Sequence, residues 1–109
     1  MISYYKYLPY CGGETLIFWA TVEGHTEIVK ILAPLTDNPN APTKYYRETP
    51  IHRAALFGYT EIVKILAPLT DNPNAQNYNG DTPYFLAARN GHLEICRILK
   101  SFKDFIPQR

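Results

Sequence analysis

The side chains that could carry out nucleophilic or metal chemistry are few in this chain of 109 residues. The candidate nucleophiles are Cys11, Cys96, Ser3 and Ser101. A catalytic cysteine needs a nearby base and an electropositive setting, and the sequence around these residues indicates neither. A zinc site needs clustered cysteines and histidines, and nucleotide binding would call for a glycine-rich phosphate loop. The sequence contains neither pattern, so it favours a protein that is not an enzyme and that holds no metal and no cofactor.

One long stretch occurs twice in the sequence. Residues 26–41 read TEIVKILAPLTDNPNA, and residues 60–75 repeat those letters without a change. A third, weaker copy begins LEICRIL at Leu93. The units open at residues 13–16, 47–50 and 80–83. These openings are 34 and then 33 residues apart, and self-similarity at one period indicates a stack of repeated units.

Each unit has the sequence pattern of two short helices and a turn. A threonine can cap the first helix by accepting hydrogen bonds from the exposed N–H groups of its first turn. In two units a proline follows, at the first helical position, where a missing N–H costs nothing. A glycine then suits the left-handed residue that ends the helix. The threonines are Thr15, Thr49 and Thr82, the prolines are Pro50 and Pro83, and the glycines are Gly24, Gly58 and Gly91.

The second helix of each unit carries one apolar stripe. In the first unit the stripe consists of Ile28, Val29, Ile31, Leu32 and Leu35. Because proline removes a helical hydrogen bond and restricts the residue before it, Pro34 and Pro68 should stop these helices near Leu32 and Leu66. The third unit has no proline there, so its last helix is expected to run one turn further, toward Phe102.

Several motifs at this period resemble the ankyrin-repeat family. The letters TPIH at residues 49–52 match the family's Thr-Pro-Leu-His signature, and TPYF and TLIF are weaker versions. The Gly-His pairs, the EIVKIL helix and the Asn-Ala step before the next unit match as well. The resemblance covers roughly residues 13–102. It implies an all-α solenoid of stacked helix-turn-helix units that are joined by hairpin-like loops.

The resemblance divides the chain into three units with short ends, which together make one domain. The segments are a cap at 1–12, repeats at 13–46, 47–79 and 80–102, and a tail at 103–109. The first segment is interpreted as a cap for the open face of the first unit, and the alternative is the remnant of a preceding unit. Trp19 is expected to pack against tyrosines of this segment, and the alternative is an exposed aromatic anchor.

The resemblance also implies roles for single residues. His25, His52 and His92 are expected to hydrogen-bond turns and brace helices rather than bind a metal. Cys96 replaces Val29 and Val63, which predicts a buried thiol.

Two loop positions depart from the pattern. Thr36 stands where the family has glycine, so Asp37 or Asn38 is expected to take the left-handed conformation. Arg47 stands where Gly13 and Gly80 stand, and a positive φ is costly for arginine. The loop at residues 42–48 is one residue longer than its counterpart, so it is expected to turn differently.

In the ankyrin-repeat family the loop tips and the ends of the first helices contact partners. The resemblance therefore implies a module that binds another protein, and the alternative is a structural spacer or part of a longer array. The corresponding residues are Glu14, Val22, Glu23, Tyr45, Tyr46, Glu48, Leu56, Phe57, Tyr78, Asn79, Asp81, Arg89 and Asn90. The large side chains among them predict an apolar binding patch; the alternative is that they pack into the core.

Composition limits the kind of partner. A net charge of +1 argues against nucleic acid, because a nucleic-acid-binding domain would show a clear basic excess. No stretch is long enough to cross a membrane, and the first residues lack the pattern of a signal peptide. The sequence therefore predicts an intracellular monomer, cytoplasmic or nuclear, that binds a protein.

Overall fold

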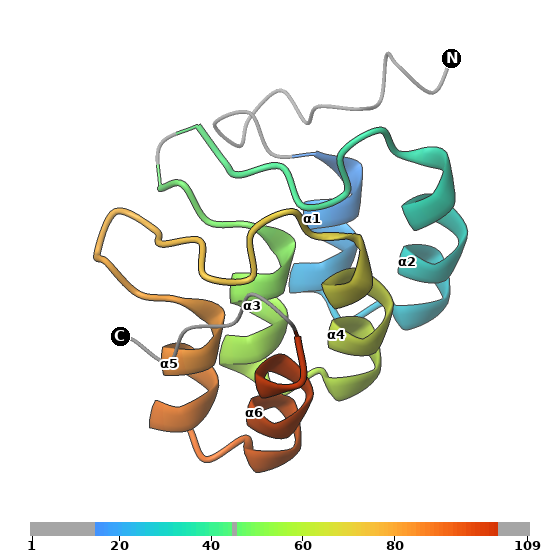
Figure 1. Ribbon diagram of the computed structural model, residues 1–109. Coiled ribbons are helices and arrows are strands. Elements are labelled where there is room, and N and C mark those ends of the chain that lie inside the picture. Colours follow the sequence, from blue (N-terminus) through green and yellow to red (C-terminus); the bar gives the residue numbers. More distant parts are fainter. Residues whose placement is uncertain (1–14, 45, 103–109) are drawn as a thin grey trace.

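A computed structural model describes residues 15–44 and 46–102 of the chain. This part of the chain forms six α-helices and two short 3₁₀ helices, and it contains no β-strand (Figure 1). The elements are α1 (Leu16–Val22), α2 (Thr26–Leu32), η2 (Ala33–Leu35), α3 (Pro50–Phe57), α4 (Thr60–Leu66), η3 (Ala67–Leu69), α5 (Pro83–Arg89) and α6 (Leu93–Lys100).

The helices stack as three neighbouring pairs in two rows. In one row α3 lies between α1 and α5, and in the other α4 lies between α2 and α6 (Figure 1). The two hairpin loops between the pairs extend to the same side of the stack. This arrangement confirms the predicted all-α stack of helix-turn-helix units.

The first helix of each pair begins as the sequence predicts. Three threonine hydroxyls accept a hydrogen bond from the backbone N–H three residues later, which satisfies a donor that the helix leaves free. The pairs are Thr15 and Phe18 at 3.1 Å, Thr49 and His52 at 3.3 Å, and Thr82 and Phe85 at 3.1 Å. Pro50 and Pro83 are the first helical residues of α3 and α5, as predicted.

Glycines in the left-handed conformation follow these helices, as expected at Gly24, Gly58 and Gly91. At Gly58 the requirement is also steric. A Cβ there would lie 2.7 Å from the His92 ring, in addition to the strain of its φ of 80°. The glycine therefore allows two neighbouring pairs to approach closely at the ends of their helices.

The prolines of the second helices act as predicted, but the turn that follows is different. α2 ends at Leu32 and α4 at Leu66, and each continues as a 3₁₀ turn that contains the proline. The Thr36 hydroxyl donates to the Leu32 carbonyl oxygen at 2.7 Å. This bond satisfies a carbonyl at the helix end without a left-handed residue. The expectation that Asp37 or Asn38 is left-handed was therefore wrong, since neither has a positive φ.

The last helix is shorter than predicted. α6 ends at Lys100, only one residue beyond Leu99, the counterpart of Leu32 and Leu66, so the expected extra turn was wrong. The N–H of Ser101 donates to the Ile98 carbonyl oxygen at 3.1 Å, and the N–H of Phe102 donates to that of Leu99 at 3.3 Å. Bonds of this i to i−3 type tighten the chain and end the α-helix.

Arg47 takes a positive φ of 54°, so its loop does not avoid the left-handed conformation. The loop nevertheless turns differently from its counterpart, as expected, because the Arg47 N–H donates to a carbonyl four residues back and the Gly80 N–H to one three residues back. Thr43, which is buried, holds the turn from both sides. Its N–H donates to the Glu48 carbonyl oxygen at 2.8 Å, and its hydroxyl accepts from the Glu48 N–H at 3.1 Å. The Arg47 N–H donates to the Thr43 carbonyl oxygen at 3.0 Å. These bonds compensate for the strain of a left-handed arginine.

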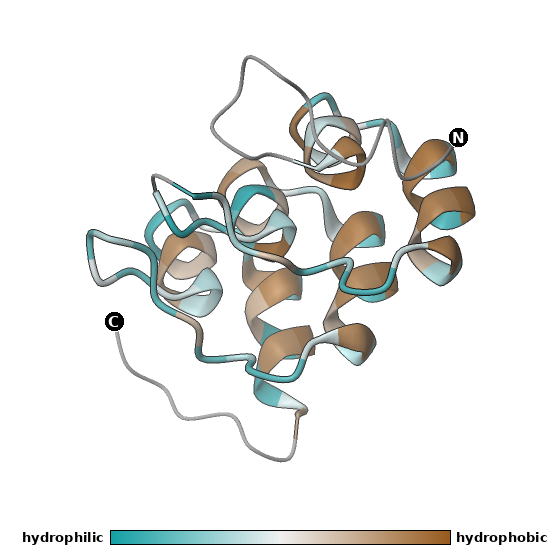
Figure 2. Ribbon diagram, turned by 90° about the horizontal axis from the view of Figure 1, so that it is seen from above, coloured by the Kyte–Doolittle hydropathy of each residue, from teal (hydrophilic) through white to brown (hydrophobic). Residues whose placement is uncertain are grey.

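The core lies between the two rows of helices. Ala20, Ala54 and Ala87 are fully buried, and their small side chains let the first helices pack closely. Figure 2 shows hydrophobic residues gathered on the helices and hydrophilic residues along the loops. Cys96 is a buried free thiol, as predicted. Burial raises the pKa of this thiol, against an opposing effect of the Lys100 charge, whereas Cys11 lies outside the described residues.

Candidate protein-binding face

Two tyrosines stand exposed on adjacent hairpin loops. Tyr46 is 66% exposed and Tyr78 is 65% exposed. The N–H of Tyr78 donates to the carbonyl oxygen of Tyr46 at 3.0 Å, which joins the two loops through their backbones. Large apolar rings are therefore held on neighbouring loops by a hydrogen bond rather than left on independent loops. Tyr45, the predicted third tyrosine of this group, lies outside the described residues, as does Glu14.

A recess of about 200 Å³ lies beside these tyrosines. It is lined by Tyr46, Glu48, Arg53, Asn77, Tyr78 and Asn79. Glu48 organises it, because one carboxylate oxygen lies 2.6 Å from Arg53 Nε and the other accepts from the Asn77 side-chain nitrogen at 3.0 Å. The carboxylate thus links α3 to the next hairpin loop.

Arg53 and Asn77 line the recess of the candidate face, and sequence reasoning did not include them. Arg53 is the one charged residue at a position that Trp19 and Leu86 occupy in the other units. That difference was the available signal. Asn77 gives no local signal, because its contact with Glu48 spans 29 residues of sequence.

The second group of predicted residues lies at the far end of the first helices. Phe57 is 43% exposed, and its ring centroid lies 5.9 Å from the Arg53 guanidinium carbon and 5.6 Å from the Tyr59 ring. Arg53 therefore contacts both Glu48 at the loop and Phe57 at the helix end. The pair of Glu48 and Arg53 therefore lies between the exposed tyrosines and Phe57.

The remaining residues at these helix ends are placed differently in each unit. Val22 and Leu56 are half-buried, and their carbonyl oxygens face the next unit. The Tyr59 hydroxyl lies 3.5 Å from the Val22 oxygen, and His92 Nε2 lies 3.1 Å from the Leu56 oxygen. Glu23, Arg89 and Asn90 are exposed at their helix ends.

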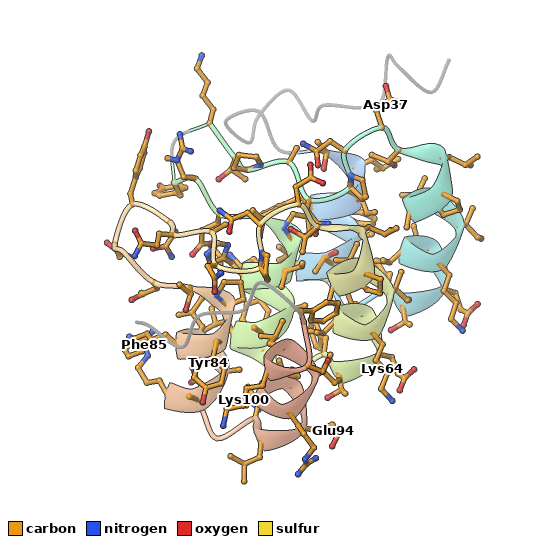
Figure 3. All side chains as sticks on the ribbon, viewed as in Figure 1. Asp37, Lys64, Tyr84, Phe85, Glu94 and Lys100 are labelled. Carbon is orange, nitrogen blue, oxygen red and sulfur yellow. The ribbon has the colours of Figure 1, made fainter. Side chains whose placement is uncertain are left out.

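The third unit places charged side chains beside the aromatic residues of its first helix. The Arg89 guanidinium carbon lies 5.2 Å from the centroid of the Phe85 ring. Lys100 Nζ lies 5.7 Å from the centroid of Tyr84, and Figure 3 shows these two side chains close together. Asp81, in contrast, is buried at 5% exposure, so its side chain is not part of the exposed face.

Two of the three histidines brace the units, as the resemblance implied. His52 is fully buried and contacts both Thr49 and the Asp81 carbonyl oxygen. His92 reaches Leu56 of the preceding unit, as described above. His25 packs its ring 5.3 Å from that of Trp19. The tyrosines expected to cover Trp19 lie outside the described residues.

In the described part of the chain, neither a shifted pKa nor a metal-binding geometry marks a catalytic centre. Burial lowers the pKa of His52 below its ordinary value, although the Asp81 carbonyl and the charges of Glu48 and Asp81 oppose the shift. This histidine is enclosed by the fold. Within residues 15–44 and 46–102, no three His, Cys, Asp or Glu side chains are grouped as they would be to hold a metal ion.

Comparison with known families identifies the architecture. The family described as ankyrin repeats (3 copies) matches residues 6–77 and again residues 37–108. The chain belongs to the ankyrin-repeat family. Ankyrin repeats are generally protein-interaction modules, and the family is typically non-enzymatic. No curated protein matches this ankyrin-repeat chain significantly. None of its described helices is both long and apolar enough to span a bilayer.

Proposed function

We propose that this ankyrin-repeat chain binds another protein through the face formed by its hairpin loops and its first helices. The observation that supports this most directly is the pair of exposed tyrosines, Tyr46 and Tyr78, on loops joined by a backbone hydrogen bond. Tyrosine supplies a large contact area at low entropic cost, which is why it is favoured in binding surfaces. The recess beside the rings offers a partner a place for a side chain.

The chemistry of the recess indicates what kind of partner fits. Glu48 and Arg53 pair with each other, so the recess has no large excess of charge. Its polar groups instead suit hydrogen bonds to a peptide backbone or to uncharged side chains, and the tyrosine rings suit an apolar side chain at the centre of the contact. We infer that the partner presents an apolar anchor surrounded by polar groups.

The test begins with affinity capture of the partner and its identification by mass spectrometry. Binding is then measured by calorimetry for Tyr46→Ala, Tyr78→Ala and Phe57→Ala. We expect each substitution to weaken binding by about 1–3 kcal/mol, as truncations of central contact residues do. The melting temperature should remain nearly unchanged, because all three side chains are substantially exposed.

Leu93→Ala is the matched control. Leu93 is 68% exposed and lies on α6, in the other row of helices, so its truncation should leave affinity intact. A different result would overturn the proposal: if the tyrosine and phenylalanine variants melt several degrees lower and bind as tightly as the original, these side chains support the fold and are not a binding site.

Two other functions make different predictions. A structural spacer or a segment of a longer array would retain no partner on this face, and all the alanine variants would behave alike. A nucleic-acid-binding protein would retain DNA or RNA in a salt-sensitive way, which the net charge of +1 does not favour.

We further infer that the chain is a monomer. We also infer a reducing, intracellular compartment, since Cys96 is a free thiol. Sedimentation and imaging of the tagged chain test these two inferences.

A further inference from the structure

α2 and α4 have the same seven residues, TEIVKIL, and yet they bury them differently. Ile62 of α4 is fully buried, whereas its counterpart Ile28 of α2 is 38% exposed. Ile65 is half-buried, whereas its counterpart Ile31 is 62% exposed. An identical sequence in two environments shows which side of α2 is less covered than the same side of α4.

The less covered side of α2 is the one that faces away from α4 in its row. α4 lies between α2 and α6, so both of its sides are covered. In the same row, α2 contacts α4 on one side, just as α4 contacts α6. Some side chains are exposed on α2 and more deeply buried at the same positions of α4. On α4, these are the side chains that face α2. We call Ile28, Ile31 and Leu32 the outer face of α2; Leu35 is left out because its counterpart Leu69 is exposed as well.

The opposite end of the row is built differently. Lys100 of α6 is exposed and stands where Ala33 and Ala67 are buried, at 4% and 1% exposure. Stacking another helix on that end in the same register would bury the lysine charge, which is costly without a partner. The α6 end therefore has a polar residue that opposes stacking, whereas the outer face of α2 retains the side chains that form a helix contact elsewhere in the same molecule.

We propose that the outer face of α2 is a stacking surface that fits the second helix of a further ankyrin-type unit. The contact would reproduce the one between α2 and α4. The added helix should carry a small apolar residue at the position of Ala33 and Ala67, because Ala33 is buried although the outer face of α2 is exposed, which places it on the side of α1 and α4. A second copy of this chain placed head to tail does not meet that requirement, because it would present Lys100.

This surface is separate from the binding face proposed above. The outer face of α2 is at one end of the stack and in the row of second helices, whereas Tyr46 and Tyr78 lie on the loops. The two proposals can therefore fail independently.

The experiment compares the natural chain with a chain in which residues 13–46 are duplicated in tandem. The junction is in register, because Gly13 then follows Tyr46 where Arg47, its counterpart, does in the natural chain. In the longer chain the second copy of α2 has a preceding helix of the required kind. We expect its urea midpoint to exceed that of the natural chain.

Ile31→Asp and Ile65→Asp are the matched substitutions. In the natural chain Ile65→Asp should lower the urea midpoint strongly and Ile31→Asp only slightly. In the longer chain Ile31→Asp in the second copy should become as damaging as Ile65→Asp. Hydrogen exchange of α2 gives an independent readout, since its amides should exchange more slowly once the face is covered.

Three results would overturn the proposal. If the duplication leaves both the midpoint and the exchange of α2 unchanged, the face does not accept an ankyrin-type unit. If Ile31→Asp is already as damaging as Ile65→Asp in the natural chain at every concentration, another segment of the chain covers the face. If sedimentation shows a dimer of the natural chain that Ile31→Asp dissociates, the occupant is a second copy.

Discussion

His52 Nε2 lies 2.9 Å from the backbone carbonyl oxygen of Asp81, and this contact joins α3 to the hairpin loop that leads into α5. On the other side of the ring, Nδ1 lies 3.1 Å from the backbone nitrogen of Thr49. Because that nitrogen can only donate, Nδ1 accepts, and the ring proton is assigned to Nε2. The neutral imidazole thus satisfies both of its nitrogens inside the core, and it bridges two units.

The first prediction concerns the effect of pH on this bridge. Burial lowers the pKa of His52 below 6.5, so the unfolded chain binds a proton at a higher pH than the folded chain does. The free energy of unfolding therefore rises with pH wherever the unfolded state holds more protons. The stability that His52 contributes should be complete above pH 6.5 and should decrease as the pH falls below that value.

The measurement is urea unfolding of the original chain and of His52→Gln from pH 8 to pH 5. Glutamine keeps a donor and an acceptor but does not titrate in this range. We expect the variant to be less stable by about 1–3 kcal/mol at pH 8, because the amide group does not occupy the positions of both ring nitrogens and a buried partner loses its hydrogen bond. The difference should shrink as the pH falls. Two curves that stay parallel over the whole range would show that His52 does not titrate on unfolding.

The elements that sequence reasoning predicted correctly depend on neighbouring letters. Thr49 caps α3 through a hydrogen bond to a residue three positions away, and Gly58 ends the same helix by its own conformational freedom. The prolines stop α2 and α4 for a reason equally local. Such features repeat with the sequence, so one unit predicts the next, and the stack follows from their period.

The features that were missed depend on contacts between distant residues. Arg47 accepts a left-handed backbone because Thr43 holds both ends of its turn. Arg53 belongs to the candidate face because Glu48 pairs with it. Asp81 stands on a loop, directly before Thr82. Its burial could not be foreseen from that place. Sequence alone predicted the exposed tyrosines but not the polar groups that join them to Phe57.

The second prediction concerns Cys96. Val29 and Val63 occupy its position in the other units and are fully buried, whereas Cys96 is 8% exposed. Cys96→Val should change the free energy of unfolding by less than about 1.5 kcal/mol, since the side chain stays apolar and valine occupies this position in the other units. Cys96→Ser should lower it by about 1–3 kcal/mol, because it buries a hydroxyl group in an apolar setting. Chemical denaturation of the two variants separates these cases. Equal tolerance of serine and valine would mean that this position is hydrated.

The third prediction concerns Arg47 and its counterpart Gly80, which take the same left-handed conformation with φ of 54° and 80°. A residue with a side chain is disfavoured there, by about 1–2 kcal/mol relative to the right-handed region. Arg47→Gly removes this strain but gives the unfolded chain more freedom, so we expect a net stabilisation of about 0.5–1 kcal/mol.

Gly80→Ala is the matched test in the opposite direction. A Cβ at Gly80 would meet no atom within 4 Å, so the substitution adds backbone strain without a steric clash. It should destabilise the chain by about 1 kcal/mol or more, since alanine is strained where φ is positive. Both variants are compared by urea unfolding at one pH, with Tyr78→Ala as a control for a change in the loop of Gly80 that does not alter a left-handed residue. Effects of opposite sign at Arg47 and Gly80 support a shared conformational requirement. If Arg47→Gly destabilises the chain, the arginine side chain contributes more to the loop than its backbone strain removes.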